Sequence, residues 1–200
     1  QWALRFFTLL LLFNLLIFAV GCSTSWITEA ESIIGALVPA VEGILVVLSG
    51  LGATALSPGV LTQIQQWGTS AQSDLQNVVL PLIQQYNAAE ATAQPGILTE
   101  IETGLSTITG GLSSILPALK VSDPATQAKV EAVVTEVSDE FQALLNLIPV
   151  IKSSATPADV LKALAAHPEV VSKVKSAKQF RKDFNSKIEA FGTQFKNWIK

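Results

Sequence analysis

The sequence predicts an all-α protein: an elongated up-down bundle of four long helices, followed by a short helix and a basic amphipathic helix at the C-terminus. Apolar residues recur from about residue 27 onward at alternating spacings of three and four, which places them along one side of a helix. No stretch sustains a period of two, the pattern of a half-buried strand. Apolar residues make up 49% of the chain and charged residues only 14%. A large apolar surface must therefore be packed inside the fold or placed in a membrane.

Residues 1–21 contain the parts of an export signal in their usual order. Arg5 precedes an apolar run over residues 6–20, and the small residues Ala19 and Gly21 lie at its end. A positive residue, an apolar run and a small-residue cleavage site are the parts of a signal peptide. The run is shorter than the roughly 20 residues that a membrane span requires. We therefore expect residues 1–21 to be a signal peptide.

The four residues Ala19-Val20-Gly21-Cys22 resemble the lipobox of bacterial lipoproteins. The resemblance is confined to this segment, and it implies that Cys22 is acylated and becomes the N-terminus. Cys22 is the only cysteine, so no internal disulfide can form. The resemblance also implies an exported protein, anchored to a membrane at the periplasmic or outer face of the bacterial envelope. Residues 22–26 would then form a short tether.

Four helices are predicted over about 27–50, 58–87, 95–118 and 124–151, and together they make a bundle domain over 27–152. The third has the most regular apolar stripe, formed by Leu98, Ile101, Leu105, Ile108, Leu112, Ile115 and Leu119. Short connections between these ranges predict antiparallel neighbours.

Prolines mark the predicted helix starts, because proline at the first helical position sacrifices no hydrogen bond. The junctions are Ser57-Pro58, Gln94-Pro95, Asp123-Pro124 and Thr156-Pro157. Pro39 and Pro81 fall inside the first two helices, where each should remove a hydrogen bond and kink the helix.

The segment 153–200 is expected to be a basic helical unit packed on the bundle. Residues 1–150 hold 3 basic and 12 acidic residues, whereas residues 151–200 hold 10 basic and 4 acidic ones. A helix over about 169–199 would gather its aromatic residues in a narrow arc, with the basic residues outside it. Packing on the acidic body is favoured, and contact with anionic lipid is the alternative. The candidate residues for membrane or partner contact are Lys178, Arg181, Lys182, Phe184, Lys187, Phe191, Phe195, Lys196 and Trp198.

The sequence holds no recognisable set of catalytic or metal-binding residues. His167 is the only histidine, and its place at a helix end favours a capping role. The carboxylate pairs Glu100 with Glu102 and Asp139 with Glu140 lie off the apolar stripes and are expected on solvated surface. We therefore expect no enzyme activity, no catalytic residue, no cofactor and no metal. Nucleic acid and small-molecule substrates are not expected as partners. The tryptophans Trp26, Trp67 and Trp198 do not interleave with basic residues, and the glycine pairs lack the context of a phosphate loop.

These features favour a non-catalytic, lipid-anchored envelope protein that acts as a helical scaffold, spacer or binding module. It would contact the membrane through the lipid on Cys22, and a protein partner or self-association remains open. The alternative is a membrane-active protein, holin-like or pore-forming, in which the N-terminal helix is retained and residues 33–56 insert. Glu42 near the centre of that segment and Pro39 beside it oppose insertion.

Overall fold

The computed structural model describes residues 25–51, 56–154 and 157–200. Within these ranges the chain forms helices and no strand, so the prediction of an all-α fold is confirmed. The predicted signal peptide and lipidation site, residues 1–22, lie outside the described residues.

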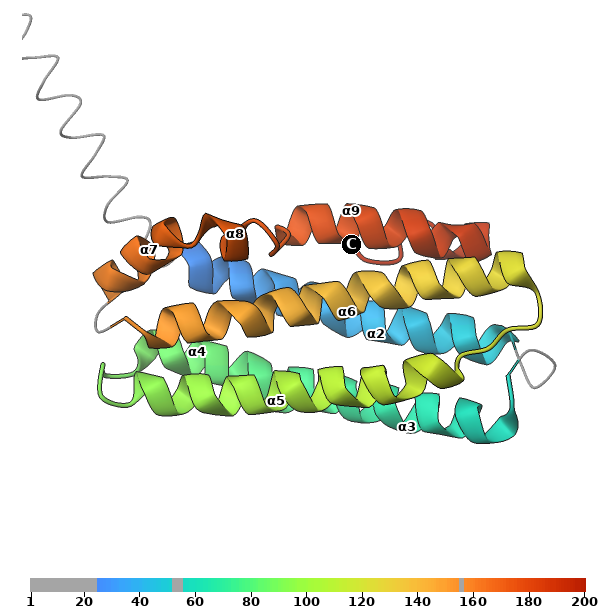
Figure 1. The fold of residues 1–200 in the computed structure, drawn as a ribbon, viewed down its shortest axis with the longest axis horizontal. Coiled ribbons are helices and arrows are strands. Elements are labelled where there is room, and N and C mark those ends of the chain that lie inside the picture. Colours follow the sequence, from blue (N-terminus) through green and yellow to red (C-terminus); the bar gives the residue numbers. More distant parts are fainter. Residues whose placement is uncertain (1–24, 52–55, 155–156) are drawn as a thin grey trace, which may run out of the picture.

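The long helices lie side by side along the long axis of the molecule (Figure 1). Following the chain, each long helical stretch runs back along the one before it, and α9 lies over α2 and α6 (Figure 1). The α-helices are α2 Ser25–Leu51, α3 Pro58–Asp74, α4 Leu80–Ala88, α5 Gln94–Ile115, α6 Pro124–Lys152, α7 Pro157–Ala166, α8 Pro168–Val171 and α9 Ala177–Ile188. A π-helical turn, η1, spans Leu75–Val79, and 3-10 turns span Leu116–Ala118 (η2), Glu189–Phe191 (η3) and Thr193–Phe195 (η4). We call α2 to α6 the helical body.

Two helix starts combine proline with a side-chain cap. The Ser57 hydroxyl accepts a hydrogen bond from the Val60 amide at 3.4 Å, ahead of Pro58. The Asp123 carboxylate accepts one from the Thr126 amide at 2.8 Å, ahead of Pro124. Each cap satisfies an amide that has no partner inside the helix, so the local sequence fixes where α3 and α6 begin.

The prolines inside helices are accommodated locally. A π-helical turn precedes Pro81, in which the Leu80 amide donates to the Leu75 carbonyl. The wider turn adjusts the helix just before the residue that cannot donate a hydrogen bond. Pro39 lies within the continuous helix α2, and its carbonyl accepts a further hydrogen bond from the Trp198 indole at 2.7 Å.

The core is built around α2, which packs against α3, α4, α6 and α9. Its large buried side chains lie on more than one face of the helix, and they include Ile33, Ile34, Leu37, Val41, Ile44 and Leu48. Leu105 on α5 and Phe141 on α6 are buried with them. A helix covered on several sides must be apolar around most of its circumference, which explains why α2 resembles a membrane helix in composition.

The expected continuous helix over 169–199 is wrong. The helix α8 ends at Val171, and α9 runs only from Ala177 to Ile188. Gly192 has a φ of 147°, a conformation that side chains rarely adopt, and the chain turns back there. The returning tail is fixed by two 2.9 Å hydrogen bonds between the Asn185 side chain and the backbone of Ile199.

The helix α9 docks between α2 and α6 through a continuous apolar face. Phe180, Phe184 and Ile188 on this face are fully buried. Gly43 on α2 admits the tail, because a Cβ at this position would lie 2.7 Å from Ile188 Cδ1 and 2.8 Å from Trp198 Nε1. The close approach of α2 and the tail therefore depends on a missing side chain.

Gly43→Ala should loosen the docking of the tail. The added methyl group must displace Ile188 and the hydrogen-bonded Trp198, so we expect destabilisation by about 1–3 kcal/mol. Gly35→Ala is the matched control, because nothing lies within 4 Å of its Cβ position, and alanine should stabilise the helix by roughly 0.5–1 kcal/mol. Thermal unfolding and hydrogen exchange of residues 193–200 measure both effects. Equal stabilisation by the two substitutions would contradict this account of the docking.

Candidate functional site

A cluster of charged side chains lies beneath the C-terminal segment. Glu136 on α6 is only 4% exposed and forms ion pairs with Lys175 and Lys187. Lys175 also pairs with Asp183 on α9 at 2.9 Å. Burying a carboxylate is unfavourable unless opposite charges and hydrogen bonds compensate it. The two lysines supply that compensation, so Glu136 is balanced only while the C-terminal segment is docked.

The partners of Lys175 determine its protonation. Burial by itself lowers the pKa of Lys175, but hydrogen bonds to Glu136 and Asp183 raise it above its ordinary value. The hydrogen bond from Lys175 lowers the pKa of Asp183 in turn. At the same end of α9, the Glu29 carboxylate accepts a hydrogen bond from the Ala177 amide at 2.5 Å. A carboxylate at a helix N-terminus is favourable because the exposed amides carry partial positive charge.

Glu140 is the least compensated charge in this cluster. It is 1% exposed, and one carboxylate oxygen accepts a hydrogen bond from the Lys175 amide at 3.4 Å. The other oxygen, Oε1, has no hydrogen-bond partner among the described residues. Burial raises the pKa of Glu140 to about 7, against the opposing effect of Lys175. Glu140 is therefore partly protonated near neutral pH.

The burial of Glu140 corrects the sequence prediction, which places it with Asp139 on solvated surface. Asp139 and Glu100 are exposed, whereas Glu140 faces the C-terminal segment. The apolar stripe of α6 faces the helical body, and α9 covers a second face of the same helix. Glu102, the remaining member of the two pairs, is partly exposed and forms an ion pair with Lys152.

The candidate contact residues separate into an inward and an outward group. Phe184 and Phe195 are buried, and Phe191 and Trp198 are partly buried against the core. Three members are exposed and form no ion pair among the described residues: Lys178, Lys182 and Lys196. Two more are partly buried: Lys187, which pairs with Glu136, and Arg181, whose Nε has no described hydrogen-bond partner. The aromatic side chains thus serve the docking of the segment, and the exposed lysines face away from the core.

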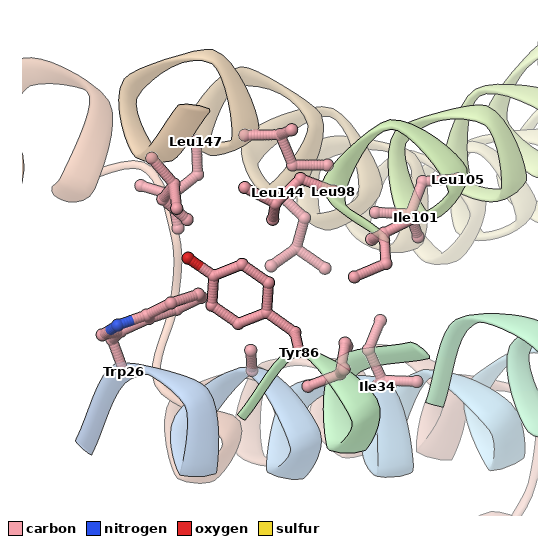
Figure 2. Close-up of a pocket in the computed structure, with 12 residues that line it drawn as sticks. Trp26, Ile34, Tyr86, Leu98, Ile101, Leu105, Leu144 and Leu147 are labelled. Carbon is pink, nitrogen blue, oxygen red and sulfur yellow. The ribbon is translucent and has the colours of Figure 1, made fainter. Parts of the chain in front are cut away.

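An apolar cavity of about 40 Å³ lies near the start of α2. Trp26 and Tyr86 meet there edge to face, with ring centroids 5.5 Å apart (Figure 2). The cavity is lined by four helices, through Trp26, Ala30, Ile34, Ile83, Tyr86, Leu98, Ile101, Leu105, Leu144, Leu147, Ile148 and Ile151. The sequence predicts Leu98, Ile101 and Leu105 only as part of an apolar stripe, and it places Trp26 in the tether. Periodicity indicates which residues are buried and not where they leave space.

A second cavity of about 240 Å³ adjoins the first and shares Trp26, Ala30, Leu144 and Leu147 with it. Residues of α7, α8 and the following loop line one side of it, and its polar lining consists of Glu29, Lys175 and Ser176. The two cavities therefore form an apolar interior with a polar rim.

The acidic residues and the histidine form no metal centre in the part of the chain that the structure describes. His167 is exposed, with Nδ1 3.1 Å from a carboxylate oxygen of Glu169. No group of three or more His, Cys, Asp or Glu side chains in the described residues is arranged to hold a metal ion. Burial raises the pKa of the Tyr86 hydroxyl, which therefore stays protonated at neutral pH.

Comparison with known proteins gives no relative. No protein-family model, curated protein or solved structure matches the chain. Within the described residues, one helix, Trp26–Leu51, is long and apolar enough to cross a membrane, and 56% of its most apolar stretch is buried in the fold. A signal or anchor helix and a core helix share this composition, so composition alone does not distinguish them.

Glu140→Gln should flatten the pH dependence of stability. The folded-state pKa of about 7 lies above the ordinary value of 4.5, so the folded protein binds this proton more tightly than the unfolded chain does. The resulting stabilisation is complete below about pH 4.5 and is lost as the pH rises through about 7. Between pH 5 and pH 8 we expect the free energy of unfolding of the wild type to fall by about 1–3 kcal/mol more than that of the variant.

Urea unfolding followed by circular dichroism across this pH range measures the difference. Asp139→Asn is the matched control, because it removes a neighbouring carboxylate that is exposed. Its stability should keep most of the wild-type pH dependence, because Asp139 makes only a small contribution to the raised pKa of Glu140. Parallel pH profiles for the wild type and Glu140→Gln would show that Glu140 does not titrate between these limits.

Proposed function

We propose that the chain is a non-catalytic, lipid-anchored protein of the bacterial envelope, exported and attached to a membrane through Cys22. The observation that carries the proposal is the position of α2, whose described residues start at Ser25, three positions after Cys22 in the sequence. An acyl group at Cys22 would therefore hold the whole folded chain close to the membrane. In this role the helices act as a scaffold, spacer or binding module, with the elongated up-down arrangement that the sequence predicts.

The disposition of the charged groups supports a role without catalysis. The buried charges that the structure describes, Glu136 and Glu140, are directed at the chain's own lysine side chain and backbone groups. His167 lies on the exposed surface, apart from this cluster. Acid–base catalysis needs a titrating group within reach of a substrate. Glu140 titrates near neutral pH but is covered by the docked segment, so its charge bears on docking.

The alternative function is a membrane-active protein in which residues 33–56 insert. The apolar character of α2 favours it, because this helix is long enough to span a bilayer. Insertion would have to withdraw Ile34, Leu37 and Ile44 from the core and would carry the exposed Glu42 into lipid. A charge near the bilayer centre is unfavourable by about 2.5–3.5 kcal/mol on insertion scales. The anchored protein requires neither step, and we favour it.

The outward lysines give the anchored protein a second contact with anionic lipid. Lys178 and Lys182 lie one turn apart on the exposed side of α9, and Lys196 follows in the tail. Each lysine near an anionic membrane surface contributes about 1 kcal/mol of attraction. A lipid chain together with a basic surface is a combination that gives stable membrane attachment.

Intact-mass analysis of protein extracted from membranes tests the anchor. We expect a chain that begins at Cys22 and carries the added mass of the acyl groups. Cys22→Ser should leave the protein without this addition and should release it from the membrane fraction. A mature chain with an unmodified Cys22 would refute lipidation, and a chain that retains residues 1–21 would support the membrane-active alternative.

Vesicle binding by the unlipidated chain from Ser23 to Lys200 tests the basic surface. This chain contains every described residue, and we expect it to bind vesicles of phosphatidylglycerol and phosphatidylcholine in proportion to their anionic content. Combined Lys178→Gln, Lys182→Gln and Lys196→Gln substitutions should weaken binding by roughly fivefold per lysine. Added salt should weaken binding of the wild type because the attraction is Coulombic.

The matched control changes net charge equally on another face. Gln63, Gln66 and Gln76 are exposed on α3 and the π-helical turn, away from α9 (Figure 1). Replacing all three with Glu lowers the net charge by the same amount as the three lysine substitutions. Equal weakening by the two triple variants would show that net charge, and not the α9 surface, governs binding.

A further inference from the structure

We propose that the paired cavities at the start of α2 bind one acyl chain of an amphiphile. We call these cavities the acyl site. Its junction is formed by Trp26, Ala30, Leu144 and Leu147, which line both cavities. The site lies at the end of the helical body where α2 begins and where α7 and α8 cross it (Figure 1).

The lining of the acyl site matches a hydrocarbon chain. Every residue of the inner cavity is aliphatic or aromatic, and these residues come from α2, α4, α5 and α6. Such a surface offers dispersion contacts and little hydrogen bonding, so water gains little by occupying it. The polar residues Glu29, Lys175 and Ser176 line only the outer cavity, where a head group would lie.

Tyr86 contributes its ring to the wall of the inner cavity. It is 6% exposed, and its hydroxyl lies between Trp26 and Leu147 (Figure 2). The ring packs edge to face against Trp26, with ring centroids 5.5 Å apart, so the two aromatic side chains form one wall of the inner cavity. This wall offers a hydrocarbon chain an apolar surface.

The size of the acyl site limits the ligand. An apolar cavity of about 150 Å³ is enough to bind benzene, and drug-sized ligands occupy about 300–1,000 Å³. The outer cavity measures about 240 Å³ and the inner one about 40 Å³. This space suits part of a single hydrocarbon chain, and it excludes the bulk of a lipid with two chains.

Two sources can supply this chain. One is a free single-chain amphiphile, and the other is an acyl group on Cys22, which precedes Trp26 closely in the sequence. Only the second source rests on the proposed lipidation. The recognition chemistry is the same for both. The experiment must therefore test whether the site binds an acyl chain and, separately, where that chain comes from.

The binding experiment uses the unlipidated chain from Ser23 to Lys200 and 12-bromododecanoic acid as the probe. Bromine quenches tryptophan fluorescence on contact, and Trp26 is the tryptophan that lines the site. We expect saturable, partial quenching, since Trp67 and Trp198 hydrogen-bond to backbone carbonyls elsewhere in the fold. Trp26→Phe should abolish the quenching. Quenching that persists in Trp26→Phe would overturn the proposal.

One further variant tests the interior of the site at temperatures where its unfolding curve shows a folded protein. Ala30→Leu fills the junction and should abolish saturable quenching. Unchanged quenching in Ala30→Leu would show adsorption to the surface and would refute an internal site. Absence of saturable quenching in the folded wild type would refute it as well.

A second arm identifies the source of the chain. Cells supplied with a diazirine-bearing fatty acid would incorporate it into any lipid on Cys22, and irradiation would crosslink it to adjacent residues. Crosslinks within the same molecule to the peptide that contains Leu144 and Leu147 would assign the site to the protein's own lipid. Saturable quenching of the unlipidated chain without such crosslinks would assign it to a free amphiphile. Lipidated protein with neither quenching nor crosslinks would refute the acyl site and leave the anchor intact.

Discussion

The burial of α2 on several sides is the constraint on which the remaining structure depends. The helix contacts α3, α4, α6 and α9, so no single partner covers its apolar surface. The body supplies part of the cover, and the C-terminal segment supplies the rest through Phe180, Phe184 and Ile188. Because the segment completes the core, its aromatic residues are engaged inside the fold, and its exposed lysines face outward.

The sequence predicts the helical class and several helix starts because those depend on local patterns. Pro58 and Pro124 begin α3 and α6, and the residue before each of them accepts a capping hydrogen bond. The path of the C-terminal segment depends instead on tertiary contacts. Heptad-like spacing continues through Gly192, and only the contacts of Trp198 and Ile199 show why the chain reverses there. A helical arc predicts which side chains are buried, but it does not fix the path of the chain between them.

The charged cluster of the candidate site likewise could not be predicted from local sequence patterns. Glu140 lies off the apolar stripe of α6, and nothing in the local sequence distinguishes it from the exposed Asp139. Its burial follows from docking of a segment whose Lys175 is 35 residues further along the chain. The pair of the buried Glu136 with the partly exposed Lys187 adds little net stability compared with apolar packing, but breaking it leaves the carboxylate with less compensation. Such pairs therefore disfavour a shifted register of α9 against α6.

Lys175 links the charged cluster to the apolar cavities. Its ammonium group pairs with Glu136 and Asp183, its amide donates to Glu140, and its side chain lines the rim of the outer cavity. A negatively charged head group at this rim would compete with the carboxylates for the same ammonium group. Protonation of Glu140 would weaken its hold on the Lys175 amide and remove one negative charge from the cluster. Binding of such a head group would therefore act on the same residue as the charge of Glu140, at the end of the fold where α2 begins.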